Sequence, residues 1–173
     1  IYRGVLTGLN EAFVIDEATK NRLIKEDKKS AEVIKPFLSG KDIKRYQPLQ
    51  SDSYLILFPK GFTNQKGNKP KNAWKWLEEN YTAIASHLKP FESKGKNRTD
   101  QGEYWWELRA CGYYDEFEKP KIIWPENSFP NNFMTDNSKL FLNKTCFFLP
   151  GSDKLLLGIL NSKLIFFILD KIC

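Results

Sequence analysis

Acidic and lysine side chains near the N-terminus are spaced as in one class of enzyme site. Asp16 is followed by Glu26 and Lys28, the order that metal-dependent nucleases use to hold Mg²⁺ and polarise a water molecule. That chemistry requires the second acidic residue and the lysine on a strand beside the first, whereas residues 17–26 read as a helix. The pattern also arises by chance in a chain with 28% charged residues. A metal-dependent nuclease therefore stays an alternative.

The single histidine and the three cysteines form no catalytic or metal-binding set. His87 has no partner in the sequence for general acid–base catalysis, and we expect it to be structural. Cys111, Cys146 and Cys173 lack CxxC spacing, which argues against a zinc site or a disulfide framework and favours a reducing, cytoplasmic setting. The sequence has no phosphate-binding loop, nucleophile elbow or HExxH motif. We therefore expect no catalytic residue, metal or cofactor in this chain.

Excess positive charge is confined to residues 60–98. This stretch holds nine lysines and arginines against three glutamates, a surplus equal to the net charge of +6 of the whole chain. A basic segment on an otherwise neutral chain is typical of a surface that approaches a polyanion. We expect the polyanion to be duplex DNA.

The expected DNA contacts are of three chemical kinds. Lysines in flexible loops suit phosphates, which supply affinity without sequence information. Arginine can donate two hydrogen bonds to guanine, and asparagine can pair with adenine. Trp105 and Trp106 are adjacent, so on a strand one would face outward and could pack on DNA. For each residue the alternative is a surface charge, a turn residue or a core side chain. The predicted contacts are Asn10, Lys41, Lys44, Arg45, Lys66, Lys69, Lys71, Lys94, Lys96, Asn97, Arg98, Trp105, Trp106 and Arg109.

The pattern of apolar residues predicts strands in both halves of the chain. Residues 2–7 and 11–16 read as a hairpin, after which Asp16 caps a helix over residues 17–26. Apolar runs at residues 53–58, 121–124 and 145–149 each stop at a proline and resemble buried strands. The fold class is therefore α+β, with a mixed sheet as its framework.

Two further helices are predicted, one of them amphipathic and the other apolar. Spacings of three and four indicate one central helix over residues 72–88, flanked by exposed basic loops at 60–71 and 90–102. A C-terminal apolar helix should run from a cap at Ser152 or Asp153 to Lys171. The apolar region at 155–169 is interrupted and shorter than the roughly 20 residues that cross a bilayer, so no membrane association is expected.

Size and composition predict a folded recognition module. The chain has 173 residues, of which 41% are hydrophobic and 14% aromatic, enough for one sizeable core. It opens at Ile1 and stops at Cys173 inside an apolar run, so we expect a piece of a longer polypeptide.

Several sequence motifs, separated along the chain, follow one another in the order that is typical of a known family, and together they resemble that family. They are Gly4-Val-Leu-Thr-Gly-Leu-Asn10 with its continuation to Asp16, Lys35-Pro-Phe-Leu-Ser-Gly40 with its continuation to Tyr46, Trp105-Trp-Glu-Leu-Arg109, Phe117-Glu-Lys-Pro120-Lys121, and Leu160-Asn-Ser-Lys163. This series resembles the TaqI-like C-terminal specificity domain, the target-recognition domain of adenine-N6 DNA methyltransferases and of fused restriction-modification enzymes. The resemblance is weakest over residues 60–102, where such families vary with the DNA sequence that they read.

The resemblance implies a DNA target-recognition domain over residues 1–173, with a variable basic insert at about 60–102. It implies recognition of a short duplex sequence in a bacterial restriction-modification or phage-defence system. The methyltransferase's Asn/Asp-Pro-Pro-Tyr/Phe loop and Gly-rich loop are missing from this sequence. S-adenosylmethionine, and Mg²⁺ for any nuclease, would therefore belong to catalytic domains elsewhere in the same polypeptide. The sequence leaves the recognised bases, the groove and the oligomeric state open.

Three other functions remain open at this point. A metal-dependent nuclease would cleave DNA with Mg²⁺ and lose that activity in Asp16→Ala. A protein-interaction scaffold would bind a polypeptide with little dependence on salt. A single-strand binder would prefer single strands to duplex.

Overall fold

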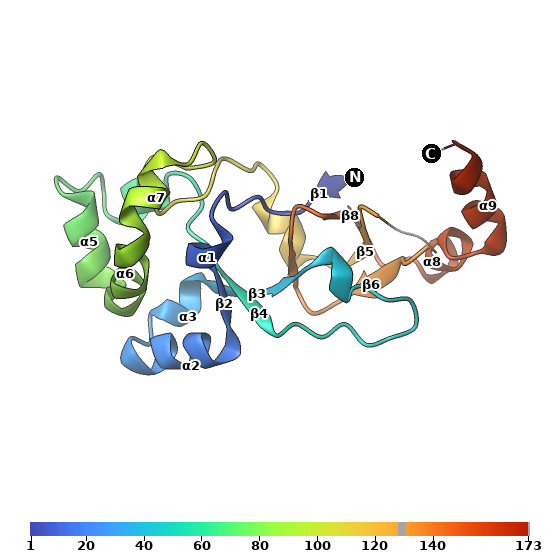
Figure 1. The fold of residues 1–173 in the computed structure, drawn as a ribbon, viewed down its shortest axis with the longest axis horizontal. Coiled ribbons are helices and arrows are strands. Elements are labelled where there is room, and N and C mark those ends of the chain that lie inside the picture. Colours follow the sequence, from blue (N-terminus) through green and yellow to red (C-terminus); the bar gives the residue numbers. More distant parts are fainter. Residues whose placement is uncertain (128–130, 173) are drawn as a thin grey trace. The chain divides into compact units, whose positions relative to one another are not determined.

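The computed structural model describes residues 1–127 and 131–172 and divides into two compact units (Figure 1). Unit 1 comprises residues 1–5, 37–51 and 113–173, and unit 2 comprises residues 6–36 and 52–112. The chain first crosses from unit 2 to unit 1 within β3 (Ile34–Leu38), whose last two residues belong to unit 1. Helices and strands occur in both units, which confirms the predicted α+β class.

Unit 1 is built on an antiparallel sheet in the order β1-β8-β5-β6. Its elements are β1 (Tyr2–Arg3), η1 (Gly40–Asp42), η3 (Tyr114–Glu118), β5 (Lys121–Pro125), β6 (Met134–Asp136), β7 (Phe141–Leu142), β8 (Cys146–Pro150), α8 (Lys154–Leu160) and α9 (Lys163–Ile172). Ile123 and Phe148 pair across β5 and β8 and are buried with Phe117, whose ring stacks on Phe141. The strands predicted at 121–124 and 145–149 are therefore confirmed, and they lie side by side.

The predicted C-terminal helix is present as two helices, α8 and α9. Asp153 caps α8, because its carboxylate accepts hydrogen bonds from the backbone N–H groups of Leu155 and Leu156 at 2.8 and 3.2 Å. The side-chain amide of Asn161 accepts a hydrogen bond from the N–H of Phe133 at 3.2 Å and donates one to the C=O of Phe133 at 2.8 Å. This contact between distant residues accompanies the break between α8 and α9, which the local pattern did not predict.

Unit 2 is mainly helical around the antiparallel pair β2 and β4. Its elements are α1 (Asn10–Phe13), β2 (Val14–Asp16), α2 (Glu17–Glu26), α3 (Ser30–Val33), β4 (Ser53–Ile56), α4 (Phe62–Lys66), α5 (Ala73–Asn80), α6 (Thr82–Leu88), η2 (Lys89–Phe91) and α7 (Glu92–Asn97). The helix predicted over residues 17–26 is confirmed with its cap, since Asp16 accepts from the N–H of Thr19 at 2.8 Å. Phe13, Leu55 and Phe58 are buried in this unit.

Both strands expected at the N-terminus are present, and each is shorter than predicted. β1 pairs with β8 in unit 1, and β2 pairs with β4 in unit 2. Residues 10–13, where the second strand was expected to begin, form α1 and bury Ala12 and Phe13. The two strands therefore take different partners, which local alternation of side chains does not specify.

The helix predicted over residues 72–88 is divided into α5 and α6 at Tyr81, which has φ −139° and ψ 58°. The Tyr81 side chain is buried, and its hydroxyl donates to a carboxylate oxygen of Glu32 at 3.1 Å. Its ring meets that of Phe58 edge-on at 5.4 Å. These contacts hold Tyr81 in the core with non-helical backbone, so the two helices pack as a pair (Figure 1).

Candidate nucleic-acid interface

Three exposed lysines of the predicted insert lie within residues 66–71, which we call the basic loop. Lys66, Lys69 and Lys71 are exposed. Within the part of the chain that the structure describes, none of the three has an acidic side chain at ion-pair distance. Their charge is therefore available to an anionic partner.

The basic loop is held at both ends by hydrogen bonds. At the end of α4 the N–H groups of Gly67 and Lys69 donate to the carbonyls of Thr63 and Asn64, both at 2.9 Å. Asn68 and Lys69 have φ of 50° and 55°, a left-handed end that asparagine tolerates well. Asn72 then caps α5 by accepting from the N–H of Lys75 at 3.0 Å. The lysines therefore extend from a defined backbone.

A buried carboxylate fixes the start of α4, the helix that leads into the basic loop. The Glu107 side chain is 0% exposed and accepts from the N–H groups of Gly61, Thr63 and Glu103 at 2.8, 2.9 and 2.9 Å. A negative charge is stabilised at a helix N-terminus, and hydrogen bonds to an ionised acceptor are among the stronger ones. Glu107 thereby joins α4 to the segment at residues 103–107.

The expectation that Trp105 or Trp106 faces outward is wrong. Both side chains are buried, and the segment is a turn rather than a strand, so neighbouring residues do not alternate between faces. The ring of Trp105 stacks on Trp74 at 5.3 Å, and that of Trp106 stacks on Tyr104 at 4.8 Å. The two tryptophans are therefore core residues of unit 2.

Arg98 is also buried, which corrects its prediction as an exposed base-reading side chain. Its guanidinium donates to the backbone carbonyls of Thr7, Asp100, Trp105 and Glu107, in hydrogen bonds of which two measure 2.8 and 2.9 Å. The same group lies 4.5 Å from the centre of the Phe13 ring. Arg98 joins three segments of unit 2 and has a structural role.

The second predicted loop, at residues 90–102, contains the helix α7 over residues 92–97, and its lysines are paired with acids. Lys94 lies 2.7 Å from the carboxylate of Glu11, and Lys96 lies 2.7 Å from that of Glu92. Hydrogen bonds from Lys89 and Lys96 lower the pKa of Glu92 to about 2. These exposed pairs offset much of the local positive charge, so the basic loop is the better candidate surface.

The remaining predicted contacts of unit 2 are exposed. Asn10 begins α1, and its Oδ1 accepts from the hydroxyl of Thr7 at 2.5 Å. Asn97 is the last residue of α7. Arg109 lies 3.4 Å from the carboxylate of Asp100. All three side chains can still be reached by a partner.

Unit 1 contributes a second basic surface at residues 41–46, which we call the 41–46 turn. Lys41 and Lys44 are exposed, and Arg45 is half-buried. The N–H of Arg45 donates to Oδ1 of Asn132 at 3.2 Å, and its Nη1 donates to the carbonyl of Asn161 at 3.1 Å. Arg45 therefore anchors the turn, while the two lysines point to solvent.

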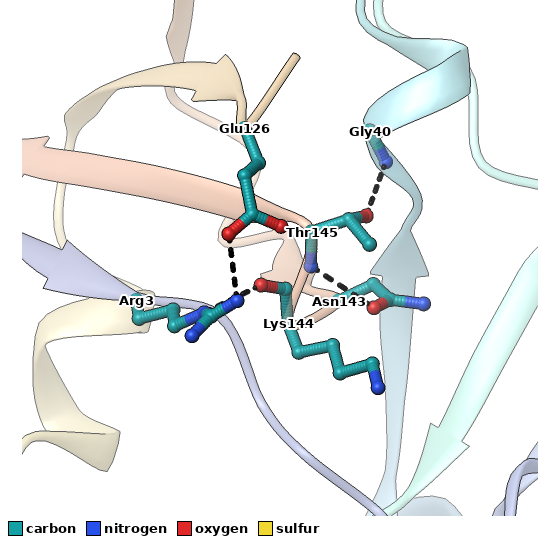
Figure 2. A network of polar contacts seen from close by, with 6 residues as sticks. All are labelled: Arg3, Gly40, Glu126, Asn143, Lys144 and Thr145. Carbon is teal, nitrogen blue, oxygen red and sulfur yellow. Dashed lines mark hydrogen bonds and ion pairs between the residues drawn. The ribbon is translucent and has the colours of Figure 1, made fainter.

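One basic residue near the 41–46 turn was missed from the sequence. The N–H of Gly40 donates to Oγ1 of Thr145 at 3.4 Å, which brings the turn between β7 and β8 next to η1 (Figure 2). Lys144 lies in that turn, and its exposed side chain extends away from Arg3 and Glu126 (Figure 2). No local pattern reports this placement, because Gly40 and Thr145 are 105 residues apart in sequence.

The structure gives the nuclease pattern a different role. Asp16 caps α2, and Glu26 at the other end of that helix pairs with Arg22 at 3.1 Å. No cluster of three metal-ligating His, Cys, Asp or Glu side chains occurs among residues 1–127 and 131–172.

Burial raises the pKa of the Cys146 thiol to about 12, so it is protonated at neutral pH. The same described residues contain no helix long and apolar enough to span a membrane.

His87 contacts the backbone of α1, and its titration gives a prediction. Its ring Nε2 lies 3.1 Å from the carbonyl oxygen of Ala12, and burial lowers its pKa below the usual value. The His87 side chain therefore binds a proton more readily in the unfolded chain than in the folded chain. We expect the free energy of unfolding to be constant above about pH 6.5 and to fall as the pH drops below it.

Urea unfolding at a series of pH values measures this effect. His87 is the only histidine, so a His87→Gln variant, whose amide can still donate to Ala12, should show a flatter profile between about pH 5.5 and 7. Equal pH dependence in both proteins would contradict the assignment.

Comparisons with known proteins identify a matching family and a similar fold. A family model described as the TaqI-like C-terminal specificity domain matches residues 35–173. The sequence motif at residues 4–16 lies outside the residues that the family model matches. One solved structure, of the type IIL restriction-modification enzyme MmeI in complex with DNA, is similar with a TM-score of 0.56 at 12% identity. The similarity covers 93% of this chain and 20% of that chain, so this chain spans about a fifth of that enzyme. No curated protein sequence matches this chain.

Proposed function

Since this chain belongs to the TaqI-like C-terminal specificity domain family, we propose that it recognises a short sequence in duplex DNA for a restriction-modification enzyme. The family match over residues 35–173 is the observation that carries the proposal. The solved relative was determined with DNA bound, which supports the same partner. Catalysis belongs to other domains of a longer parent, which we propose to be an adenine-N6 methyltransferase using S-adenosylmethionine.

Within this function, the exposed lysines contact phosphates. Lys66, Lys69 and Lys71 extend from a loop whose ends are hydrogen bonded, so little conformational freedom is lost when DNA binds. Lys41, Lys44 and Lys144 form the corresponding surface of unit 1. Arg109 and Asn97 are exposed and have the chemistry to read guanine and adenine. Residues 60–102 are proposed to vary with the sequence recognised.

Replacing the three basic-loop lysines by glutamine tests the proposal. We expect Lys66→Gln/Lys69→Gln/Lys71→Gln to weaken binding of every duplex sequence alike. The slope of log affinity against log salt should fall in magnitude by about 2 to 3, since each phosphate contact contributes about 0.9. Fluorescence anisotropy with labelled duplexes at several salt concentrations measures both quantities.

A matched control removes three other exposed lysines of unit 2. Lys25→Gln/Lys28→Gln/Lys29→Gln changes the net charge equally at the C-terminal end of α2, and we expect a much smaller loss. Equal losses in the two triple variants would show that only net charge matters. Unchanged affinity in the basic-loop variant, or tighter binding of single strands than of duplex, would contradict the proposal.

A further inference from the structure

Tyr46 combines an unusual backbone conformation with nearly complete exposure. Its φ is 66°, in the left-handed region that bulky residues rarely adopt. Its side chain is 81% exposed, so this conformation is not accompanied by burial of the ring in the core. Backbone strain of this kind is concentrated at sites that bind ligands, because there the surrounding structure imposes it.

The surroundings of Tyr46 hold it in place. Arg45, its neighbour, is anchored through its backbone to Asn132 and through its guanidinium to Asn161, at 3.2 and 3.1 Å. The same guanidinium lies 5.0 Å from the centre of the Tyr46 ring. The N–H of Gln47 closes the turn by donating to the carbonyl of Lys44 at 3.2 Å. The ring therefore has one side near an anchored cation, while its hydroxyl and remaining surface face solvent.

The charges along this turn favour an anionic partner. Lys41 and Lys44 are exposed on the same turn, and Lys144 lies beside the Gly40–Thr145 contact. In the described ranges none of these three lysines has an ion-pair partner. Asp42, the one acidic residue of the 41–46 turn, is also exposed, and its carboxylate accepts from the N–H of Ser39 at 3.3 Å.

From these observations we infer that Tyr46 is a direct contact to the DNA backbone, a role that rests on the proposed function. The exposed face of the ring packs on a deoxyribose, and the hydroxyl donates to a phosphate oxygen, while the flanking lysines bind neighbouring phosphates. A fixed aromatic side chain gains contact area at small conformational cost, which explains why the fold holds tyrosine in this conformation.

Substitutions at residue 46 separate strain from binding. Glycine adopts positive φ without cost, so Tyr46→Gly should keep or raise the melting temperature while it weakens duplex binding by about tenfold, or about 1.4 kcal/mol. Tyr46→Phe keeps the ring and loses the hydroxyl, and should weaken binding by about two- to threefold. Thermal unfolding and anisotropy with the same duplex give the two readouts.

The outcomes distinguish this inference from the proposed function. If the basic-loop triple variant loses affinity and Tyr46→Gly binds as tightly as the unaltered chain, the role of Tyr46 is wrong and DNA recognition stands. If the unaltered chain shows no salt-dependent binding of duplex DNA, the proposed function and the role of Tyr46 are both wrong. If Tyr46→Gly binds weakly and Tyr46→Phe binds normally, the ring contact stands and the phosphate hydrogen bond is wrong.

Discussion

Arg98→Met is expected to lower the free energy of unfolding by about 4 kcal/mol, because it leaves several buried carbonyl groups without a donor. Methionine can still pack on Phe13, so the loss reports hydrogen bonding more than volume. The carbonyl groups of Thr7, Trp105 and Glu107 lie in two segments, and the guanidinium of Arg98 bonds to both of them. Chemical denaturation followed by tryptophan fluorescence measures the change, since four of the five tryptophans lie in unit 2.

Two further variants make the Arg98 result specific. Arg98→Lys keeps the charge but presents a point donor instead of a planar fork, so it should lose about half as much stability. Arg22→Met makes the same chemical change at an exposed residue of α2, where the ion pair with Glu26 contributes less than about 0.5 kcal/mol. If Arg98→Met and Arg22→Met have equal stability, Arg98 does not hold unit 2 together.

The Arg98 variant should also affect DNA binding indirectly. Arg98 bonds the carbonyl of Glu107, and the carboxylate of Glu107 holds the start of α4, which leads into the basic loop. Loss of Arg98 therefore loosens the support of Lys66, Lys69 and Lys71. We expect weaker duplex binding even at temperatures at which the variant is still folded.

Lys121→Met is expected to cost about 3–5 kcal/mol of stability, because it leaves the Asp136 carboxylate buried without its cation. Both side chains are 0% exposed, and Lys121 Nζ lies 2.5 Å from Asp136 Oδ2 and 2.6 Å from the carbonyl oxygen of Phe117. Burial lowers the pKa of Lys121, and the adjacent carboxylate opposes that shift. Asp136 also accepts from the N–H groups of Ser138 and Leu140 at 2.7 and 2.9 Å, so its charge shapes the turn after β6.

Lys119→Met is the matched control for Lys121→Met. Lys119 lies two residues earlier and pairs with Glu116 at 2.6 Å, but its side chain is 57% exposed. Because surface ion pairs contribute about 0–1 kcal/mol, this variant should unfold close to the unaltered chain. The urea midpoint of each protein gives the comparison, and a loss below about 1 kcal/mol in Lys121→Met would contradict the role of the buried pair.

The local elements of this fold could be predicted from the sequence. Asp16 and Asp153 cap their helices because a carboxylate reaches N–H groups two or three residues further along the chain. The apolar runs before Pro125 and Pro150 form neighbouring buried strands. Each of these signals is contained within a few residues, so it can be recognised without knowledge of the rest of the chain.

The candidate site depended much more on the tertiary structure. The same residue types that predict DNA contacts also form the core here: Arg98 bonds the carbonyl of Thr7, 91 residues away in sequence, and Trp105 stacks on Trp74. Lys94 is paired with Glu11, 83 residues away. No local pattern reports such pairings, so the sequence could not separate Arg98 from the exposed Arg109.

The α+β class and the concentration of net charge in one segment can be read from the amino-acid order, because composition, helix capping and side-chain periodicity are local properties. Which charged groups stay in solvent depends on the folded chain as a whole. Burial of a guanidinium or a carboxylate requires partners that approach from distant parts of the chain, as with Arg98 and Glu107. The exposed lysines of the basic loop and of the 41–46 turn keep their charge available to an anionic partner, because acidic partners are absent around them in the described ranges.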